Sequence, residues 1–290
     1  MLKERIQSSI MMFGLFSLTY FFLDYVFFEF LVLTVGGFLL FELGKILKLH
    51  GVSLLFFWFL ALTPLFIYFI STLTSNFGNF FNLSESIYFT KNLYPLILNF
   101  LSILVPFLAS LSLIFWFFIV PFDIAYKKLS SNSLFKVFYG LFLITPMLIT
   151  TMSIFVINKN LLLIIILMVL LADIGAYFSG KRFGRIKLVK NISPGKTFEG
   201  LLGGFLFNII FMLFLYIYGF LNIFDGFLLA FLVTALSLYG DIYESFLKRM
   251  ANIKDSSNLI PGHGGFLDRM DSFCPTIPIL YFLLRAFEYL

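Results

Sequence analysis

The sequence predicts an all-α, polytopic integral membrane protein with about nine transmembrane helices. Of its 290 residues, 61% are hydrophobic and only 12% are charged, whereas a soluble domain has about 25% charged residues. Residues 49–84, 92–122, 137–158 and 200–224 contain no Asp, Glu, Lys or Arg. Each stretch exceeds the roughly 20 apolar residues that a helix needs to cross the hydrocarbon core. Residues 161–171 are apolar at every position, which excludes the alternating strands of a membrane β-barrel.

Hydropathy, with Pro, Gly and charged residues as boundaries, divides the chain into these helices. A turn near Asp24 separates the first two, and the last contains Arg285 and Glu288. Because no Ala-x-Ala-like cleavage site follows the first apolar run, we expect a membrane helix there and not a removed signal peptide. Cys274 is the single cysteine, which excludes an intramolecular disulfide. The predicted spans are residues 9–23, 25–41, 52–71, 98–120, 137–157, 161–179, 201–220, 224–240 and 274–290.

The basic residues predict the orientation, because Lys and Arg accumulate on cytoplasmic loops. With the N-terminus inside, all of the 20 basic residues except Lys91, Lys159 and Arg285 fall on cytoplasmic segments. This distribution favours an odd number of spans. We expect the protein in the cell inner (plasma) membrane.

Polar residues concentrate in the C-terminal half, where 9 of the 15 acidic residues lie at or beyond Asp173. Two segments predicted on the cytoplasmic face, 180–199 and 241–273, contain most of the side chains that can do chemistry. A helical hairpin connects them, so both return to one face and can form one site. We therefore divide the chain into an N-terminal transmembrane scaffold, 1–160, and a C-terminal catalytic region, 161–290.

The first polar segment begins with an acid near the end of an apolar span. A carboxylate at membrane depth is costly, so Asp173 is a candidate functional residue. On a helix, Asp173 and Tyr177 share a stripe that leads to Lys181 and Arg182. Six basic residues between positions 181 and 196 suit several phosphates. Anionic lipid headgroups, and a helix-end ion pair for Asp173, are the structural alternatives.

The run from Ser193 to Glu199 predicts an anion site. Ser193 precedes a proline, which fits a first helical turn, so we expect Ser193 to be the N-cap of the next helix. Free N–H groups at that helix start, beside Lys196 and the Thr197 hydroxyl, would bind an anion. The spacing of a Walker A loop is absent. Two following glycines, four residues apart, allow close packing on a neighbouring helix.

The second polar segment predicts a metal site. If its first helix continues, Asp241, Ser245 and Lys248 lie on one stripe. Asp268 and Asp271, at i and i+3, can face the same way. Three carboxylates near Lys and Arg suit Mg²⁺ shared with substrate phosphates. Helix-end ion pairs are the structural alternative.

His263 lies between glycines after this helix, where a role in binding metal or phosphate competes with a purely structural one. Arg249 and Arg269 extend the basic character of the segment. The sequence contains no His-Glu-x-x-His and no Gly-x-Ser-x-Gly pattern. Zinc hydrolysis and a serine triad therefore have no support.

The stretch from Ser245 to Asp271 resembles the C-terminal signature of the phosphatidate cytidylyltransferases, also called CDP-diacylglycerol synthases. It carries the Pro-Gly-His-Gly-Gly turn and ends in Asp-Arg-Met-Asp. Residues 193–204 resemble the second motif of this family, and residues 173–184 resemble its lead-in. The first 150 residues resemble it only in hydropathy.

This resemblance implies transfer of CMP from CTP to phosphatidic acid in phospholipid biosynthesis, with release of pyrophosphate and formation of CDP-diacylglycerol. It also implies Mg²⁺ held by Asp241 and Asp268, with Asp271 near them. A second, monovalent cation is expected beside the Mg²⁺. The expected partners are CTP, phosphatidic acid and membrane lipids, with no nucleic acid, and a homodimer is left open.

Our hypothesis for the site combines the resemblance with the chemistry of the residues. The phosphates of two polyanions repel each other, so neutralisation and in-line positioning are the main tasks. Lys181 and Arg182 can contact either the lipid phosphate or the nucleotide. The predicted catalytic residues are Asp241, Asp268, Asp271, Lys196, Lys248 and Arg249. The predicted substrate-binding residues are Asp173, Tyr177, Lys181, Arg182, Ser193, Lys196, Thr197, Glu199, Ser245, His263 and Arg269.

Two other classes of protein share some of these features. A CTP-dependent kinase of a polyprenol, phytol or related lipid alcohol would use the same nucleotide but would make CDP and a lipid phosphate. The long C-terminal signature argues against it. A transporter also has polar residues at membrane depth, but here they crowd one face and do not line a path across the membrane.

Overall fold

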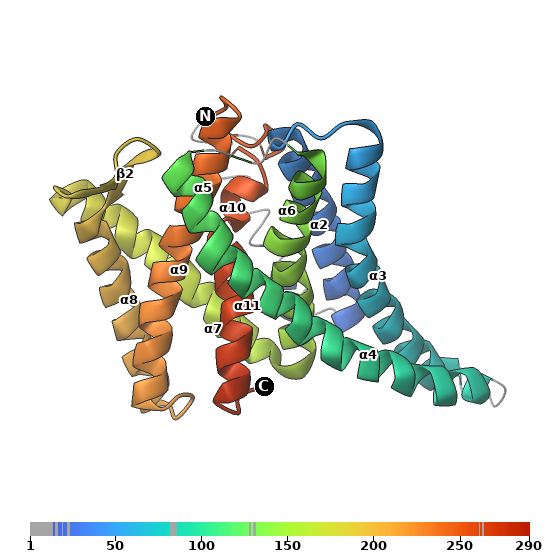
Figure 1. Ribbon diagram of the computed structural model, residues 1–290. Helices are drawn as coiled ribbons and strands as arrows, with labels where there is room; N and C mark the ends of the chain where they lie inside the picture. Colours follow the sequence, from blue (N-terminus) through green and yellow to red (C-terminus); the bar gives the residue numbers. More distant parts are fainter. Residues whose placement is uncertain are drawn as a thin grey trace.

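The structure is a computed structural model that describes residues 14, 17–18, 20–21, 24–81, 86–127, 129, 132–260, 262 and 264–290. The side chains of 74–95 and 97–98 are not described. Most of the predicted first span, 9–23, and His263 therefore lie outside the described residues. Apart from one short hairpin and the loops that connect the elements, the described residues are helical (Figure 1). The prediction of an all-α membrane protein is therefore confirmed.

The first described helices confirm three predicted spans and extend each of them. α2 begins after Asp24 and ends at the charged turn that contains Lys48. α3 continues through Pro64, and a five-residue π-helical turn interrupts the helix that follows α3. The elements are α2 (Tyr25–Ile46), α3 (Gly51–Phe81), α4 (Ser86–Ile114), η1 (Phe115–Ile119) and α5 (Val120–Tyr126).

The next two elements, α6 (Ser133–Leu143) and α7 (Thr145–Phe183), contain the predicted spans 137–157 and 161–179. A straight helix of the 39 residues of α7 would be about 58 Å long, nearly twice the hydrocarbon thickness. α7 is not straight, because the backbone of Asn158 leaves the helical conformation (φ −153°, ψ 90°) and divides the helix into two arms. Its side-chain oxygen accepts a hydrogen bond from Leu161 N at 3.2 Å, so it begins the second arm of α7.

The C-terminal elements confirm the predicted spans 201–220 and 224–240. The elements are α8 (Phe198–Ile217), α9 (Ile223–Met250), α10 (Leu267–Met270) and α11 (Phe273–Ala286). α9 continues past Asp241, as expected, so Asp241, Ser245 and Lys248 lie on one helix. α11 has only 14 residues, fewer than the roughly 20 that a perpendicular span requires.

Six helical stretches in the described part of the chain are long and apolar enough to cross a membrane, compared with nine predicted spans. Three differences between the predicted spans and the structure account for the lower number. Spans 137–157 and 161–179 fall in one continuous stretch, Ser133–Phe183, and α11 is too short. The span 9–23 lies largely outside the described residues. The count of nine is therefore not confirmed.

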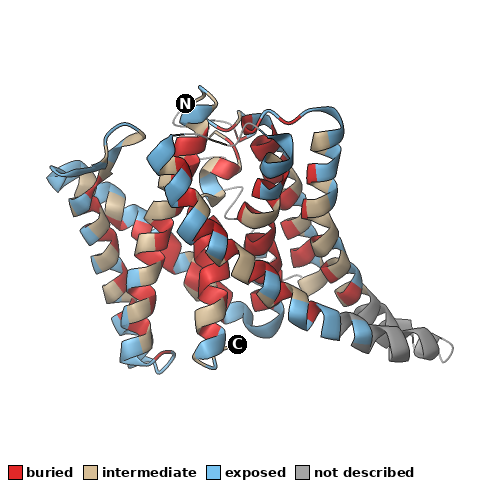
Figure 2. Cartoon of the chain, viewed as in Figure 1, coloured by how far each residue is buried: buried red, intermediate tan, exposed pale blue. Residues whose placement is uncertain are grey.

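Helix packing depends on small residues, as predicted for Gly200 and Gly204. A Cβ on Gly204 would approach Ala172 O to 2.6 Å, and one on Gly200 would approach Ala176 O to 3.0 Å. α7 and α8 therefore meet backbone to backbone. Buried side chains concentrate along the inner faces of the helices, and large apolar side chains remain exposed on the outer faces (Figure 2). An outward apolar surface of this kind matches a lipid environment.

The polar loops gather at one end of the molecule. Figure 1 shows the β-hairpin, α10 and the loop from α2 to α3 at the end opposite the C-terminus. The turn between α8 and α9 lies at the same end as the C-terminus. The two predicted polar segments thus lie on one face, which confirms that they can form one site.

Candidate active site

A short hairpin carries the first polar segment. Strands β1 (Lys187–Val189) and β2 (Ser193–Thr197) pair antiparallel, with Lys187 opposite Thr197. The pairing keeps the chain extended up to Thr197, whose side-chain oxygen caps α8 by accepting a hydrogen bond from Gly200 N at 3.1 Å. The prediction that Ser193 is the N-cap is therefore wrong, because Ser193 lies within β2, four residues before the N-cap Thr197.

Glu199, in the first turn of α8, fixes the connection from α7 to the hairpin. Its carboxylate accepts hydrogen bonds from Arg185 N at 2.9 Å and Ile186 N at 3.2 Å. The contacts of Glu199 in the structure are thus with backbone N–H groups, and its predicted role toward substrate is untested.

Lys196, near the end of β2, faces three carboxylates. Its ammonium forms an ion pair with Asp241 from α9. Asp173 from α7 and Asp271, which follows α10, lie close enough to raise the pKa of Lys196 although burial lowers it. We call Asp173, Lys196, Asp241 and Asp271 the Lys196 cluster. It joins both predicted polar segments, so their expected convergence is confirmed.

Hydroxyl and backbone donors hold the acids of the Lys196 cluster. Ser237 donates to Asp173 at 2.7 Å, and Ser272 N donates to Asp271 at 2.8 Å. Ser245, one turn along α9, lies 3.4 Å from Asp241. The side chains of Lys196 and Asp241 keep 29% and 22% of their surface exposed, so solvent reaches the pair. The cluster thus contains three acids and one lysine, and its Lys196–Asp241 pair is open to solvent.

Gly240 brings α9 against the turn that contains Asp271. A Cβ at this position would overlap Asp271 O and lie 2.9 Å from Pro275 Cδ. The neighbouring Asp241 is thereby held close to Asp271. Burial raises the pKa of Asp271 well above its ordinary value, and the negative charges of Asp241 and Asp173 raise it further.

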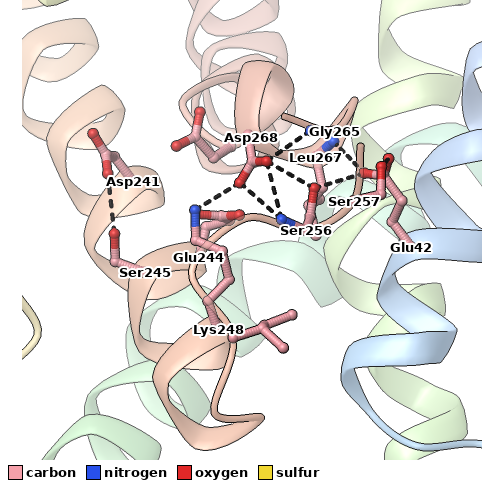
Figure 3. A network of polar contacts seen from close by, with 12 residues as sticks. Glu42, Asp241, Glu244, Ser245, Lys248, Ser256, Ser257, Gly265, Leu267 and Asp268 are labelled. Carbon is pink, nitrogen blue, oxygen red and sulfur yellow. Dashed lines mark hydrogen bonds and ion pairs between the residues drawn. The ribbon is translucent and has the colours of Figure 1, made fainter. Parts of the chain in front are cut away.

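Asp268 belongs to a second and more closed group, shown in Figure 3. Lys248 Nζ lies 2.6 Å from Asp268 Oδ1 and 2.5 Å from Glu244 Oε2. The side chains of Lys248, Glu244 and Asp268 expose only 13%, 5% and 8% of their surface. We call these three residues with Ser256 the Asp268 cluster.

The loop between α9 and α10 surrounds the Asp268 carboxylate with donors. Asp268 Oδ2 accepts hydrogen bonds from Ser256 N at 3.0 Å, from Ser256 Oγ at 3.0 Å and from Gly265 N at 2.8 Å. Burial alone would raise the pKa of Asp268, but hydrogen bonds with Glu244, Gly265 and Lys248 outweigh it and lower the value to about 2. Asp268 is therefore ionised and has nearly all of its lone pairs engaged.

The structure separates the two residues predicted to bind metal. Asp241 pairs with Lys196, whereas Asp268 pairs with Lys248. Asp268 and Asp271, expected to face the same way, also have different partners. Each predicted ligand thus has its own lysine, and whether both bind one ion is untested.

Several other predicted residues lie outside both clusters. Lys181 Nζ lies 5.6 Å from the centre of the exposed Tyr177 ring. Arg182 lies 5.5 Å from the centre of the Phe183 ring. Arg249 is exposed and donates to Ile253 O at 3.4 Å, and Arg269 is also exposed. These four cations are all exposed, and we call them the outer cations.

Two residues that contact the site, Glu42 and Glu244, were not predicted from the sequence. Glu244 is four residues before Lys248 on α9, a spacing at which acid and base pair on one helix face. Glu42 lies inside an apolar span, and the rule that selected Asp173 as a costly membrane carboxylate applies to it equally. Both signals were in the sequence, but only the fold shows which partners they meet.

Membrane-spanning helices with acids and lysines gathered at one end define an integral membrane protein with a polar site at that end. The chain belongs to the cytidylyltransferase family, whose sequence profile matches residues 3–287.

Curated proteins named phosphatidate cytidylyltransferase are similar to part of this chain. The protein from Aquifex aeolicus is 41% identical over 164 residues, which cover 57% of this chain and 62% of the relative. The one from Pseudomonas aeruginosa is 49% identical over 130 residues (43% and 48%), and the one from Bacillus subtilis is 47% identical over 120 residues (40% and 44%). The match thus spans between about two fifths and three fifths of each relative.

Proposed function

We propose that this protein is a phosphatidate cytidylyltransferase that makes CDP-diacylglycerol and pyrophosphate from CTP and phosphatidic acid. The Lys196 cluster carries the proposal. It places one lysine and three acids, partly open to solvent, beside a basic hairpin at one end of a membrane protein of the cytidylyltransferase family. The named activity of the relatives supports the same reaction.

In this reaction a phosphate oxygen of the lipid attacks the α-phosphorus of CTP. The new P–O bond forms as the bond from the α-phosphorus to the bridging oxygen breaks, and pyrophosphate leaves with that electron pair. A phosphate monoester is largely a dianion near neutral pH, since its second pKa is about 6. No general base is required, so the residues need only neutralise charge and align the two substrates.

We assign the residues by their position in the two clusters. Lys196 and Thr197, at the start of α8 with Ser193 in the same strand, bind the nucleotide phosphates. Lys248 contacts the lipid phosphate or the leaving pyrophosphate from within the Asp268 cluster. The outer cations Arg249, Arg269, Lys181 and Arg182 attract the polyanionic substrates to this face.

The residues fit a Mg²⁺ ion that is shared with substrate but not one held by protein alone. Among the described residues, no group of three or more His, Cys, Asp or Glu side chains is arranged to hold a metal. Mg²⁺ in nucleotide enzymes is commonly held by one or two carboxylates together with substrate phosphates. Asp241 and Asp268 would supply those carboxylates, and the bound ion would neutralise charge on the triphosphate.

An aromatic cavity of about 720 Å³ suits the lipid part of the substrate. It is lined mainly by aromatic side chains from η1, α5 and α6, with Asp123 among them. The Asp123 carboxylate accepts hydrogen bonds from Tyr139 at 2.7 Å and Tyr243 at 2.9 Å. Tyr243 directly precedes Glu244 of the Asp268 cluster. We expect an acyl chain of phosphatidic acid to occupy this cavity while its phosphate reaches the Asp268 cluster.

We place the polar face in the cytoplasm, where CTP is available, and the protein in the inner membrane with its N-terminus inside. The positive-inside distribution of Lys and Arg supports this orientation. Single cysteines introduced at exposed Lys254 and at Phe220, in the Cys274→Ala background, can be labelled in intact cells with a membrane-impermeant reagent. Labelling at position 220 only is expected, and labelling at 254 only would reverse the topology.

The test of the reaction uses purified protein in detergent, short-chain phosphatidic acid, Mg²⁺ and CTP labelled on its α-phosphate. We expect label in a lipid product with equimolar pyrophosphate, and loss of transfer with EDTA. CTP labelled on its γ-phosphate is the control, because a lipid-alcohol kinase would move that label to lipid. If no α-label reaches lipid, the proposed function is wrong.

A further inference from the structure

Glu42 lies near the end of α2, far from the C-terminal site in sequence, yet it contacts the loop of the Asp268 cluster. Its side chain is fully buried. Oε2 accepts hydrogen bonds from Ser256 Oγ at 2.9 Å and Leu267 N at 2.7 Å. Oε1 accepts hydrogen bonds from Ser257 Oγ at 2.5 Å and Phe266 N at 3.0 Å. Each oxygen therefore has one hydroxyl donor and one backbone donor (Figure 3).

These four bonds hold both ends of one loop. Ser256 and Ser257 lie soon after α9 ends, and Phe266 and Leu267 lie where α10 begins. The described residues of the intervening chain form no helix; a bridge joins Ile260 and Gly264, and Leu259 N donates to Ser257 Oγ at 3.1 Å. Hydrogen bonds to a buried charged acceptor are about twice as strong as neutral ones. Glu42 is thus the main polar contact between α2 and this loop.

The same loop supplies the donors that orient Asp268. Ser256 Oγ lies 2.9 Å from Glu42 Oε2 and 3.0 Å from Asp268 Oδ2. One hydroxyl has one proton, so the two carboxylates share it, and the backbone N–H groups of Ser256 and Gly265 complete the Asp268 contacts. A Cβ on Gly265 would lie 2.5 and 2.6 Å from the Glu42 oxygens, so glycine permits this approach.

We propose that Glu42 is a positioning residue for cytidylyl transfer, which holds Asp268 in its orientation through Ser256 and the 256–267 loop. The inference rests on the proposed function for its kinetic consequence, because Asp268 acts there as a ligand of Mg²⁺. It also brings α2 into the catalytic unit, which the sequence division at residue 160 had left in the scaffold.

Glu42→Gln is the informative change, because it keeps the shape of the side chain and replaces one acceptor oxygen by an amide NH₂. Whichever way the amide turns, its NH₂ faces a backbone N–H, of either Phe266 or Leu267, that cannot rotate away. The loop then loses an attachment at α10. Changes to groups that support a metal ligand typically cost 10–100-fold in metal affinity or activity.

Glu29→Gln is the matched control. Glu29 is also a fully buried glutamate of α2, but its carboxylate contacts Thr72 of α3 and not the loop. Both variants remove one buried carboxyl group from the same helix. A general effect of that loss on folding would therefore appear in both.

The first measurement is amide hydrogen exchange of residues 255–267 in detergent, with neither CTP nor lipid present. We expect Glu42→Gln to speed exchange in this loop, and Glu29→Gln to leave it at the wild-type rate. Equal exchange in Glu42→Gln and wild type would overturn the proposal. This readout does not depend on activity, so it decides the attachment of the loop even if the wild-type protein fails to transfer CMP.

The second measurement is steady-state transfer as a function of Mg²⁺. We expect Glu42→Gln to lower kcat, and to raise the Mg²⁺ concentration for half-maximal rate, by about 10–100-fold. Ser256→Ala, combined with Glu42→Gln, should cost little more than the larger single change, because both changes loosen the same loop around Asp268. Fully additive losses, or equal losses in Glu42→Gln and Glu29→Gln, would contradict a positioning role. A wild-type protein inactive toward CTP and phosphatidic acid would instead refute the proposed function.

Discussion

The Lys196 cluster and the Asp268 cluster contain the same kinds of groups but differ in how completely those groups are satisfied. Around Lys196, three acids share one partly exposed lysine. Around Asp268, a nearly buried lysine pairs with two acids, and Ser256 and Gly265 add further donors. The first group is partly open to solvent and has three acids for one lysine, and the second is nearly closed.

This difference predicts different consequences of substitution in the two clusters. An open cluster with unneutralised acids can accept a cation and the phosphates that accompany it. A closed cluster is costly to disturb, because removing one partner leaves the other charge buried and unpaired. We therefore expect changes in the Lys196 cluster to affect activity mainly, and changes in the Asp268 cluster to affect stability as well.

The largest expected effect tests this distinction with the two predicted metal ligands. Asp241→Asn should reduce transfer by about 10²–10³-fold, the range for loss of one preorganised electrostatic group, with little change in thermal stability. Asp268→Asn should lose both activity and stability, because its amide NH₂ would face the N–H groups of Ser256 and Gly265. Asp225→Asn, at the other end of α9, is the control. Substantial residual activity in Asp241→Asn would remove it from the proposed metal site.

The two lysines provide the next comparison. Lys248→Met should lower the free energy of unfolding by about 3–5 kcal/mol, because Glu244 and Asp268 are then buried without a cation. Lys196→Met breaks a partly exposed ion pair, and the expected loss is about 1 kcal/mol. Denaturant titration in detergent measures both. Equal losses would show that the two clusters do not differ in closure.

Gly240 tests whether close packing maintains the Lys196 cluster. Gly240→Ala should destabilise the protein by about 1–3 kcal/mol, because the added methyl group overlaps Asp271 O. Gly37→Ala in α2, where a Cβ meets no atom within 4 Å, should be neutral or slightly stabilising. Thermal midpoints in detergent compare the two, and a stable Gly240→Ala variant would argue against this contact.

The smallest expected effect is the acid dependence of the Asp268 cluster. The pKa of Asp268 is lowered from 3.8 to about 2, so its ionised form stabilises the folded state above pH 3.8. That contribution, at most about 2 kcal/mol, should be lost as the pH falls from about 4 to about 2. Asp268→Asn should remove this part of the pH dependence of stability. An unchanged profile in the variant would mean that other acids produce it.

Some elements of the fold were predicted from the sequence and others were not. Apolar runs located α2, α3, α8 and α9 correctly, because lipid imposes length and hydropathy on each helix separately. The break at Asn158 falls between the predicted spans 137–157 and 161–179, whereas the 14 residues of α11 are fewer than predicted, since helix length there does not follow from local hydropathy. Ser193 was misread as an N-cap because proline suggested a helix start, whereas pairing with β1 keeps β2 extended to Thr197.

By itself, the sequence determined the membrane class, the segments that carry polar chemistry and the resemblance to a family. These are properties of local composition and of residue order along the chain. Only the tertiary structure decided that Asp241 pairs with Lys196, that Asp268 pairs with Lys248, and that Glu42 reaches the loop of residues 256–267. Each of these contacts joins separate segments, so its existence depends on how the helices pack and not on the spacing of residues within any one of them.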